Sequence, residues 1–151
     1  IEPVELADPF ADLALFIYHE LMSELRHLRR PDNDLPGGGR LIIEATTAMT
    51  TIDVDRADDS RSNLAVMLEA VDEIARQLRL RNIGGAVLVD CLRLKSAKQR
   101  KQVSNSLSAA VQYDACSVQV HGFTNTGMLE ITRERRAPPL ALRLPGSFDD
   151  F

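Results

Sequence analysis

Residues 72–90 read DEIARQLRLRNIGGAVLVD, and this stretch decides the fold. Its first part has the apolar spacing of a helix and turns basic toward its end, where cations suit the negative end of the helix dipole. Gly84 and Gly85 supply the backbone freedom needed to leave a helix and enter a sheet. The apolar run 86–89 is typical of a strand covered on both faces. Asp90 then follows at the strand end, where such sheets tend to place ligands.

The pattern on either side of this unit predicts further helices and strands. Apolar residues at helical spacing predict helices over 12–30, 63–81 and 97–112. Alternating polarity around turn residues predicts two hairpins, whose strands cover 40–45 with 49–54 and 117–122 with 128–133. Segments 31–39 and 56–62 are rich in turn-forming or charged residues and are expected to be loops. We therefore predict an α/β fold of the mixed α+β kind, with helices packed on a mixed β-sheet.

Length and composition indicate one domain with a real core. We expect a single domain over 1–151, divided into an N-terminal helix and loop over 1–34, a core over 35–140 and a tail over 141–151. No apolar run approaches the roughly 20 residues that span a bilayer, and no signal peptide is visible. We therefore expect a cytoplasmic protein with no membrane partner. Because the chain starts at Ile1 rather than Met, we expect a fragment or a shortened protein.

Charge is distributed unevenly, although the net charge is only −4. Residues 1–75 hold 16 acids and 6 bases, whereas residues 76–151 hold 12 bases and 6 acids. This asymmetry fits a basic face for nucleic acid beside an acidic pocket, or a solvated surface on which the two halves mix. The two cysteines, Cys91 and Cys116, make no zinc motif and are expected to be free thiols in a reducing compartment.

Three aspartates are the candidates for metal chemistry. Asp53 and Asp55 lie two residues apart on a predicted strand, so both point to one face while Ile52 and Val54 point into the core. If the strand ending at Asp90 is a neighbour, the three carboxylates converge, and a divalent ion such as Mg²⁺ would offset their repulsion. The alternative is structural: charges that blunt an exposed strand edge, and a loop or cap acid at Asp90.

A basic run without an intervening acid follows these candidates. It consists of Arg93, Lys95, Lys98, Arg100 and Lys101. These side chains can hold the phosphates of RNA, or they can form the solvated start of a helix. Near the end of the chain, Arg133, Arg135 and Arg136 can contact RNA or the acidic half of the protein. Phe123, in a predicted hairpin loop, can stack on a base, although a lone Phe more often belongs to a core.

Four segments in order resemble the ribonuclease E/G family of bacterial endoribonucleases. The specific one is 72–90, and the weaker ones are LPGGG with LIIE over 35–44, TTIDVD over 50–55 and GMLEITR over 127–133. The resemblance covers about 35–140. It implies a DNase I-like subdomain, Mg²⁺-dependent cleavage of single-stranded RNA with Mn²⁺ as a substitute metal, and a homodimer by analogy. It implies no zinc site, because the family's shared cysteine pair is absent.

The resemblance also implies roles for residues. Asp53 and Asp90 match the two aspartates that hold the catalytic metal. Asp55 replaces a family Asn and is expected to act as a third or outer-shell ligand. Met67 replaces another Asn, and segment 115–117 (Ala-Cys-Ser) lacks an arginine that often helps to hold the scissile phosphate. These departures keep two alternatives open: a relative that binds RNA or protein without cutting, and another metal hydrolase on the same kind of sheet.

Overall fold

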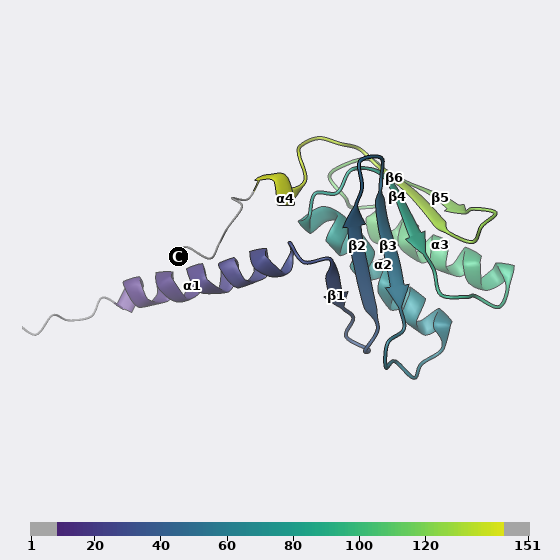
Figure 1. Ribbon diagram of the computed structural model, residues 1–151, viewed down its shortest axis with the longest axis horizontal. Helices are drawn as coiled ribbons and strands as arrows, with labels where there is room; N and C mark the ends of the chain where they lie inside the picture. Colours follow the sequence, from purple (N-terminus) through teal and green to yellow (C-terminus); the bar gives the residue numbers. More distant parts are fainter. Residues whose placement is uncertain (1–8, 144–151) are drawn as a thin grey trace, which may run out of the picture.

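A mixed six-stranded sheet forms the centre of the protein, and helices cover one of its faces (Figure 1). The computed structural model describes residues 9–143. In the sheet the strands follow the order β1-β2-β3-β4-β6-β5. Their bounds are Asp32–Asp34 for β1, Arg40–Ala45 for β2, Thr50–Asp55 for β3, Gly85–Asp90 for β4, Val118–Phe123 for β5 and Leu129–Arg133 for β6. The helices are α1 (Pro9–His27), α2 (Asn63–Leu80), α3 (Ala97–Val111) and α4 (Leu140–Arg143).

One parallel pair lies in the middle of the sheet. Strands β3 and β4 run parallel, and every other neighbouring pair is antiparallel. Helix α2 connects β3 to β4, because parallel neighbours need a crossover rather than a tight turn. The carboxyl ends of β3 and β4 therefore meet at the same edge of the sheet. The predicted mixed sheet with packed helices and both predicted hairpins are confirmed.

The core lies between the sheet and helices α2 and α3. Alternate residues of the central strands and one stripe of α2 are fully buried there, among them Leu41, Ile52, Val87, Val89, Leu129, Ile131, Met67, Ile74 and Leu78. The prediction that β4 is covered on both faces is wrong. Ala86 is exposed and Leu88 is half-buried, because none of the helices within residues 9–143 covers the second face of the sheet. An apolar run of four residues does not reveal which of its alternate side chains are covered.

The end of α2 is fixed by Asn82 rather than by the two glycines. Asn82 has a φ of 49°, and its N–H donates to the carbonyl of Arg79 while the N–H of Ile83 donates to the carbonyl of Leu78. These two bonds close the helix in the Schellman pattern, with Asn in the left-handed position where Gly is more common. Gly85, with a φ of 94°, then leads into β4.

A buried ion pair ties the loop before β5 to the end of β6. Arg133 and Asp114 have side chains that are only 5% and 1% exposed, and they share two hydrogen bonds of 3.0 Å. Arg133 also donates to the carbonyl of Ile83 at 3.0 Å. Of the two alternatives for Arg133, contact with RNA is disfavoured, because its guanidinium is buried against Asp114 and the carbonyl of Ile83. Burial acts to raise the pKa of Asp114, but bonds from Arg133 and the N–H of Cys116 hold that pKa below its usual value.

Helix α1 extends away from the sheet (Figure 1). Leu15, Ile17, Tyr18 and Leu21 are exposed on it. A helix was predicted here over 12–30, and the structure gives Pro9–His27. Of the expected tail, residues 144–151 lie outside the described part of the chain. No helix within residues 9–143 combines the length and apolar character needed to cross a membrane.

Candidate active site

Asp53 and Asp90 are direct neighbours across the parallel pair. They are register partners on β3 and β4, and both are exposed on the uncovered face of the sheet. Because neighbouring strands lie about 4.8 Å apart, their carboxylates can approach one ion. The pKa of Asp53 is raised, mainly by partial desolvation, next by the charge of Asp90 and last by the charge of Asp55. Within residues 9–143 neither Asp53 nor Asp90 forms an ion pair. The pair is thus a concentration of negative charge that no ion pair from the described residues neutralises.

Asp55 does not complete a three-carboxylate cluster. It lies on the same face as Asp53, as predicted, while Ile52 and Val54 are buried. Its Oδ1 accepts a hydrogen bond of 3.0 Å from the N–H of Ala57 in the following loop. Among the described residues, no group of three or more His, Cys, Asp or Glu side chains is arranged to hold a metal. The predicted convergence of three acids is therefore wrong, and two acids meet.

Two carboxylates still suit one kind of metal ion. Mg²⁺ usually keeps several waters and binds through one or two carboxylates, whereas Ca²⁺ needs six to eight oxygen ligands. The pKa of Asp53 is raised first by partial desolvation and then by repulsion from Asp90 and Asp55, and a cation at this point would relieve that repulsion. The residues present therefore fit a hydrated Mg²⁺ or Mn²⁺ ion.

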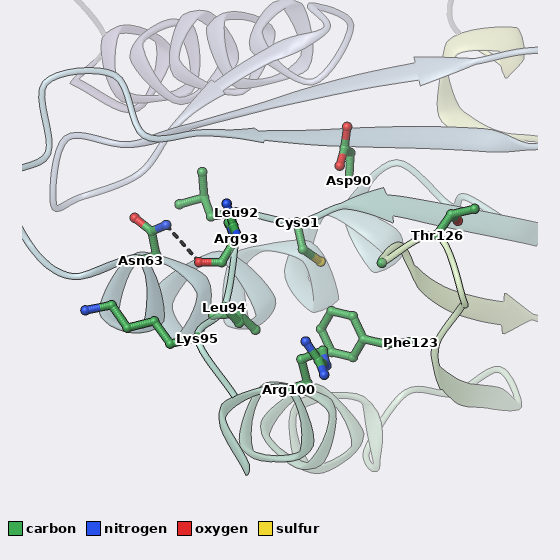
Figure 2. Close-up of a pocket in the computed structure, with 11 residues that line it drawn as sticks. Asn63, Asp90, Cys91, Leu92, Arg93, Leu94, Lys95, Arg100, Phe123 and Thr126 are labelled. Carbon is green, nitrogen blue, oxygen red and sulfur yellow. Dashed lines mark hydrogen bonds between the residues drawn. The ribbon is translucent and has the colours of Figure 1, made fainter. Parts of the chain in front are cut away.

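A pocket of about 820 Å³ opens at the end of β4 (Figure 2). Asp90 stands on its rim, and its other walls come from the loop 91–95, the first turns of α2 and α3, and the β5–β6 hairpin. Three members of the basic run line it: Arg93, Lys95 and Arg100. The other two, Lys98 and Lys101, are exposed on α3 and do not line it. The structure therefore places part of the predicted basic run beside Asp90.

Asn63 braces the wall of this pocket. Its Oδ1 accepts a hydrogen bond of 3.1 Å from Arg56, and its Nδ2 donates one of 2.9 Å to the carbonyl of Arg93 (Figure 2). Asn63 thus joins the loop before α2 to the loop after β4. A second pocket of about 420 Å³ adjoins the first and shares Asn63, Arg93 and Lys95 with it. Sequence reasoning missed Asn63, because an Asn at a helix start is ordinarily a cap.

Two of the three departures from the family pattern, Met67 and segment 115–117, lie away from the carboxylate pair, whereas Asp55 lies two residues along β3 from Asp53. Met67 is fully buried in the core. Segment 115–117 precedes β5, whose start pairs with the end of β6 and so lies beside the start of β4. Asp90 is at the opposite end of β4. Cys91 does border the pocket, but burial raises the pKa of its thiol to about 12, so it is not a nucleophile at neutral pH.

Comparison with known families gives a match over residues 3–136 to the Ribonuclease E/G family. The chain therefore belongs to the ribonuclease E/G family. The match begins well before residue 35, where the resemblance seen in the sequence began.

Individual relatives agree with this assignment. Ribonuclease E of Haemophilus influenzae is 34% identical over 135 residues, which cover 85% of this chain and 14% of that protein. Ribonuclease E of Escherichia coli is 33% identical over 135 residues, covering 85% and 13%. Ribonuclease G of Escherichia coli is 35% identical over 129 residues, covering 80% and 26%. The chain thus spans about one-seventh of these ribonuclease E proteins and one-quarter of the ribonuclease G.

Proposed function

We propose that this chain is the hydrolytic core of a Mg²⁺-dependent endoribonuclease that cuts single-stranded RNA. The observation that carries the proposal is the register pairing of Asp53 with Asp90 on the uncovered face of the sheet. A divalent ion supplies, when bound, an activated water and a counter-charge for the phosphate. Asp53 and Asp90 would hold this ion, with Mn²⁺ as a substitute. Asp55 would act on it through water, because its Oδ1 is bonded to Ala57.

The basic residues would hold the RNA backbone. Arg93, Lys95 and Arg100 line the pocket that Asp90 borders, so phosphates bound there pass close to the carboxylates. Lys98 and Lys101 would extend this contact along the exposed side of α3. The free thiols Cys91 and Cys116 fit a reducing, cytoplasmic compartment. We also propose that the chain forms a homodimer. Within the chain, 1–34 would be an N-terminal helix and loop, 35–140 the core and 141–151 a tail.

Cleavage of a labelled single-stranded RNA tests the proposal. The wild-type chain is incubated with the RNA in Mg²⁺ or in chelator, beside Asp53→Asn, Asp90→Asn and Glu44→Gln. Glu44 is the matched control, because it is an exposed acid of the neighbouring strand β2 that pairs with Thr51 rather than with either aspartate and does not contribute to the raised pKa of Asp53. We expect cleavage that needs Mg²⁺, disappears in both aspartate variants and survives in Glu44→Gln. Cleavage that persists in Asp53→Asn and Asp90→Asn would overturn the metal site.

A second candidate is a relative that binds RNA without cutting it. The hydrogen bond from Ala57 to Asp55 favours this candidate, because it leaves Asp53 and Asp90 as the two acids that would hold the metal directly. RNA binding by the wild-type chain, together with no Mg²⁺-dependent cleavage in the same assay, would select it. A longer protein that includes this chain should then be assayed, because the match covers only 13% of the ribonuclease E and 26% of the ribonuclease G of Escherichia coli.

A further inference from the structure

A β-bulge near the end of β5 sets the direction of Phe123. Val120 pairs with Ile131, but Gly122 pairs with Glu130, so β5 carries one residue more than β6 between these pairs. Gly122 has a φ of 95°, a conformation that favours Gly. Bulges of this kind re-aim the side chains that follow them.

The bulge turns Phe123 toward the helices. Phe123 is the partner of Leu129, and directly opposed residues share a face of the sheet. Leu129 is fully buried on the helix-covered face, so Phe123 points to that side as well. With regular alternation from Val120, Phe123 would instead point to the uncovered face. The extra residue therefore moves one aromatic ring into the pocket at the end of β4.

In that pocket the ring keeps an accessible surface. Phe123 is half-buried, and it lies beside Arg100 and below Cys91 (Figure 2). Asp90 and Thr126 border the same pocket. Its volume of about 820 Å³ is well above the roughly 300 Å³ at which ligand pockets begin. A space of this size, with an aromatic wall and a guanidinium, is suited to a flat, polar ring attached to a phosphate.

We infer that Phe123 and Arg100 form a subsite for one unpaired nucleobase of the RNA, next to the phosphate that Asp53 and Asp90 act on. Every base has a π-face, so stacking on Phe123 selects an unstacked base without selecting its identity. Arg100 can lie against the base or hold its phosphate. A base inside a duplex is stacked and paired and cannot enter the pocket. The inference rests on the proposed function and adds to it a reason for preferring single strands.

RNA with a single abasic position, moved step by step along the strand, tests the subsite with the unaltered protein. Binding is measured by fluorescence anisotropy in chelator, so that cleavage does not enter. We expect one position at which loss of the base lowers affinity by roughly tenfold, in the range of one stacking interaction. Equal affinity for all abasic strands would overturn the subsite.

Variants of Phe123 assign the effect to this ring. Phe123→Leu keeps an apolar side chain and should lose about tenfold in affinity for intact RNA. It should lose nothing further on the strand that is abasic at the sensitive position. Phe123→Trp should keep the affinity, because it keeps an aromatic ring. Tyr113→Leu is the control: it removes a separate aromatic side chain that is 88% exposed, and it should not change the affinity. Additive losses from Phe123→Leu and from the abasic position would contradict the assignment.

The two proposals fail in different ways. An abasic-sensitive position without Mg²⁺-dependent cleavage would keep the subsite and reject the nuclease. Cleavage that depends on Asp90 without any abasic-sensitive position would keep the nuclease and reject the subsite. Absence of RNA binding by the wild-type chain would overturn both.

Discussion

Asp53 and Asp90 carry a cost in the folded protein. Partial desolvation raises the pKa of Asp53, and repulsion from the carboxylate of Asp90 on the adjacent strand raises it further. Because the carboxylates form no ion pair within residues 9–143, no side chain offsets the charge directly. Sites of this kind are often less stable than a neutral substitute, since function rather than stability requires them.

Removing one charge should therefore stabilise the metal-free protein. We expect Asp53→Asn to raise the melting temperature at neutral pH in chelator, because Asn keeps the shape and removes the repulsion. Addition of Mg²⁺ should raise the melting temperature of the wild type and leave that of Asp53→Asn almost unchanged. Glu44→Gln serves as the control. A lower melting temperature for Asp53→Asn in chelator would argue against repulsion at this pair.

Asn63 holds the wall of the pocket in place, and we do not assign it a direct contact with RNA. Loss of its bonds to Arg56 and to the carbonyl of Arg93 should release the loop after β4. We expect Asn63→Ala to lower the free energy of unfolding by about 1–2 kcal/mol, as two part-exposed hydrogen bonds imply. RNA affinity should fall several-fold as well.

The comparison for Asn63 is Asn105→Ala, on the exposed side of α3. Urea unfolding and RNA anisotropy on the same preparations separate the two effects. If Asn63→Ala loses stability but binds RNA like Asn105→Ala, then Asn63 has only a structural role.

At the scale of the elements, the ion pair between Asp114 and Arg133 holds the loop before β5 to the strand ends. Asp114→Asn would leave the buried Arg133 uncompensated, so we expect a loss of about 3–5 kcal/mol in the free energy of unfolding. Glu134→Gln disturbs the exposed pair with Arg136 and should cost much less. Urea unfolding at neutral pH measures both, and equal losses would contradict this ranking.

The same pair predicts a pH dependence. The folded-state pKa of Asp114 is lowered, so its stabilising effect is complete above the unfolded-state pKa and is lost as the pH falls through the folded-state pKa. The gap in stability between wild type and Asp114→Asn should therefore shrink in acid. A gap that stays constant from neutral pH to strong acid would contradict the lowered pKa.

Most elements were predictable from periodicity, and the failures have physical reasons. Both hairpins and helices α2 and α3 follow from alternating or helical apolar spacing. Strand β1 was missed, because Asp32–Asp34 has no apolar alternation and is held by pairing with β2. The bulge in β5 was also missed, since Gly122 inside a strand is its only sequence signal.

The candidate site was partly predictable for a related reason. Asp53 and Asp55 share a face by simple alternation, so that prediction needed no tertiary information. The pairing of Asp53 with Asp90 depends on strand order and register, which a single sequence does not contain. The hydrogen bond from Ala57 to Asp55 depends on the geometry of the loop after β3, which the sequence pattern does not contain.

At the scale of the whole molecule, the acidic and basic side chains lie in different regions of the surface. Acids of β2 and β3 lie on the uncovered face, and Arg93, Lys95 and Arg100 line the pocket at the end of β4. Asp90 belongs to both regions. An RNA strand held by the bases would therefore reach the acids only at the carboxyl end of the parallel pair. Helix α1 takes no part in this arrangement, because it extends away from the sheet (Figure 1).

Metal binding by the intact chain tests the central claim most directly. Mn²⁺ is titrated into the wild type, Asp53→Ala, Asp90→Ala and Glu44→Ala, and the free ion is followed by electron paramagnetic resonance, with Mg²⁺ as competitor. The account predicts one weak site in the wild type and in Glu44→Ala, displaced by Mg²⁺ and lost in both aspartate variants. The same Mn²⁺ affinity in all four proteins would contradict it.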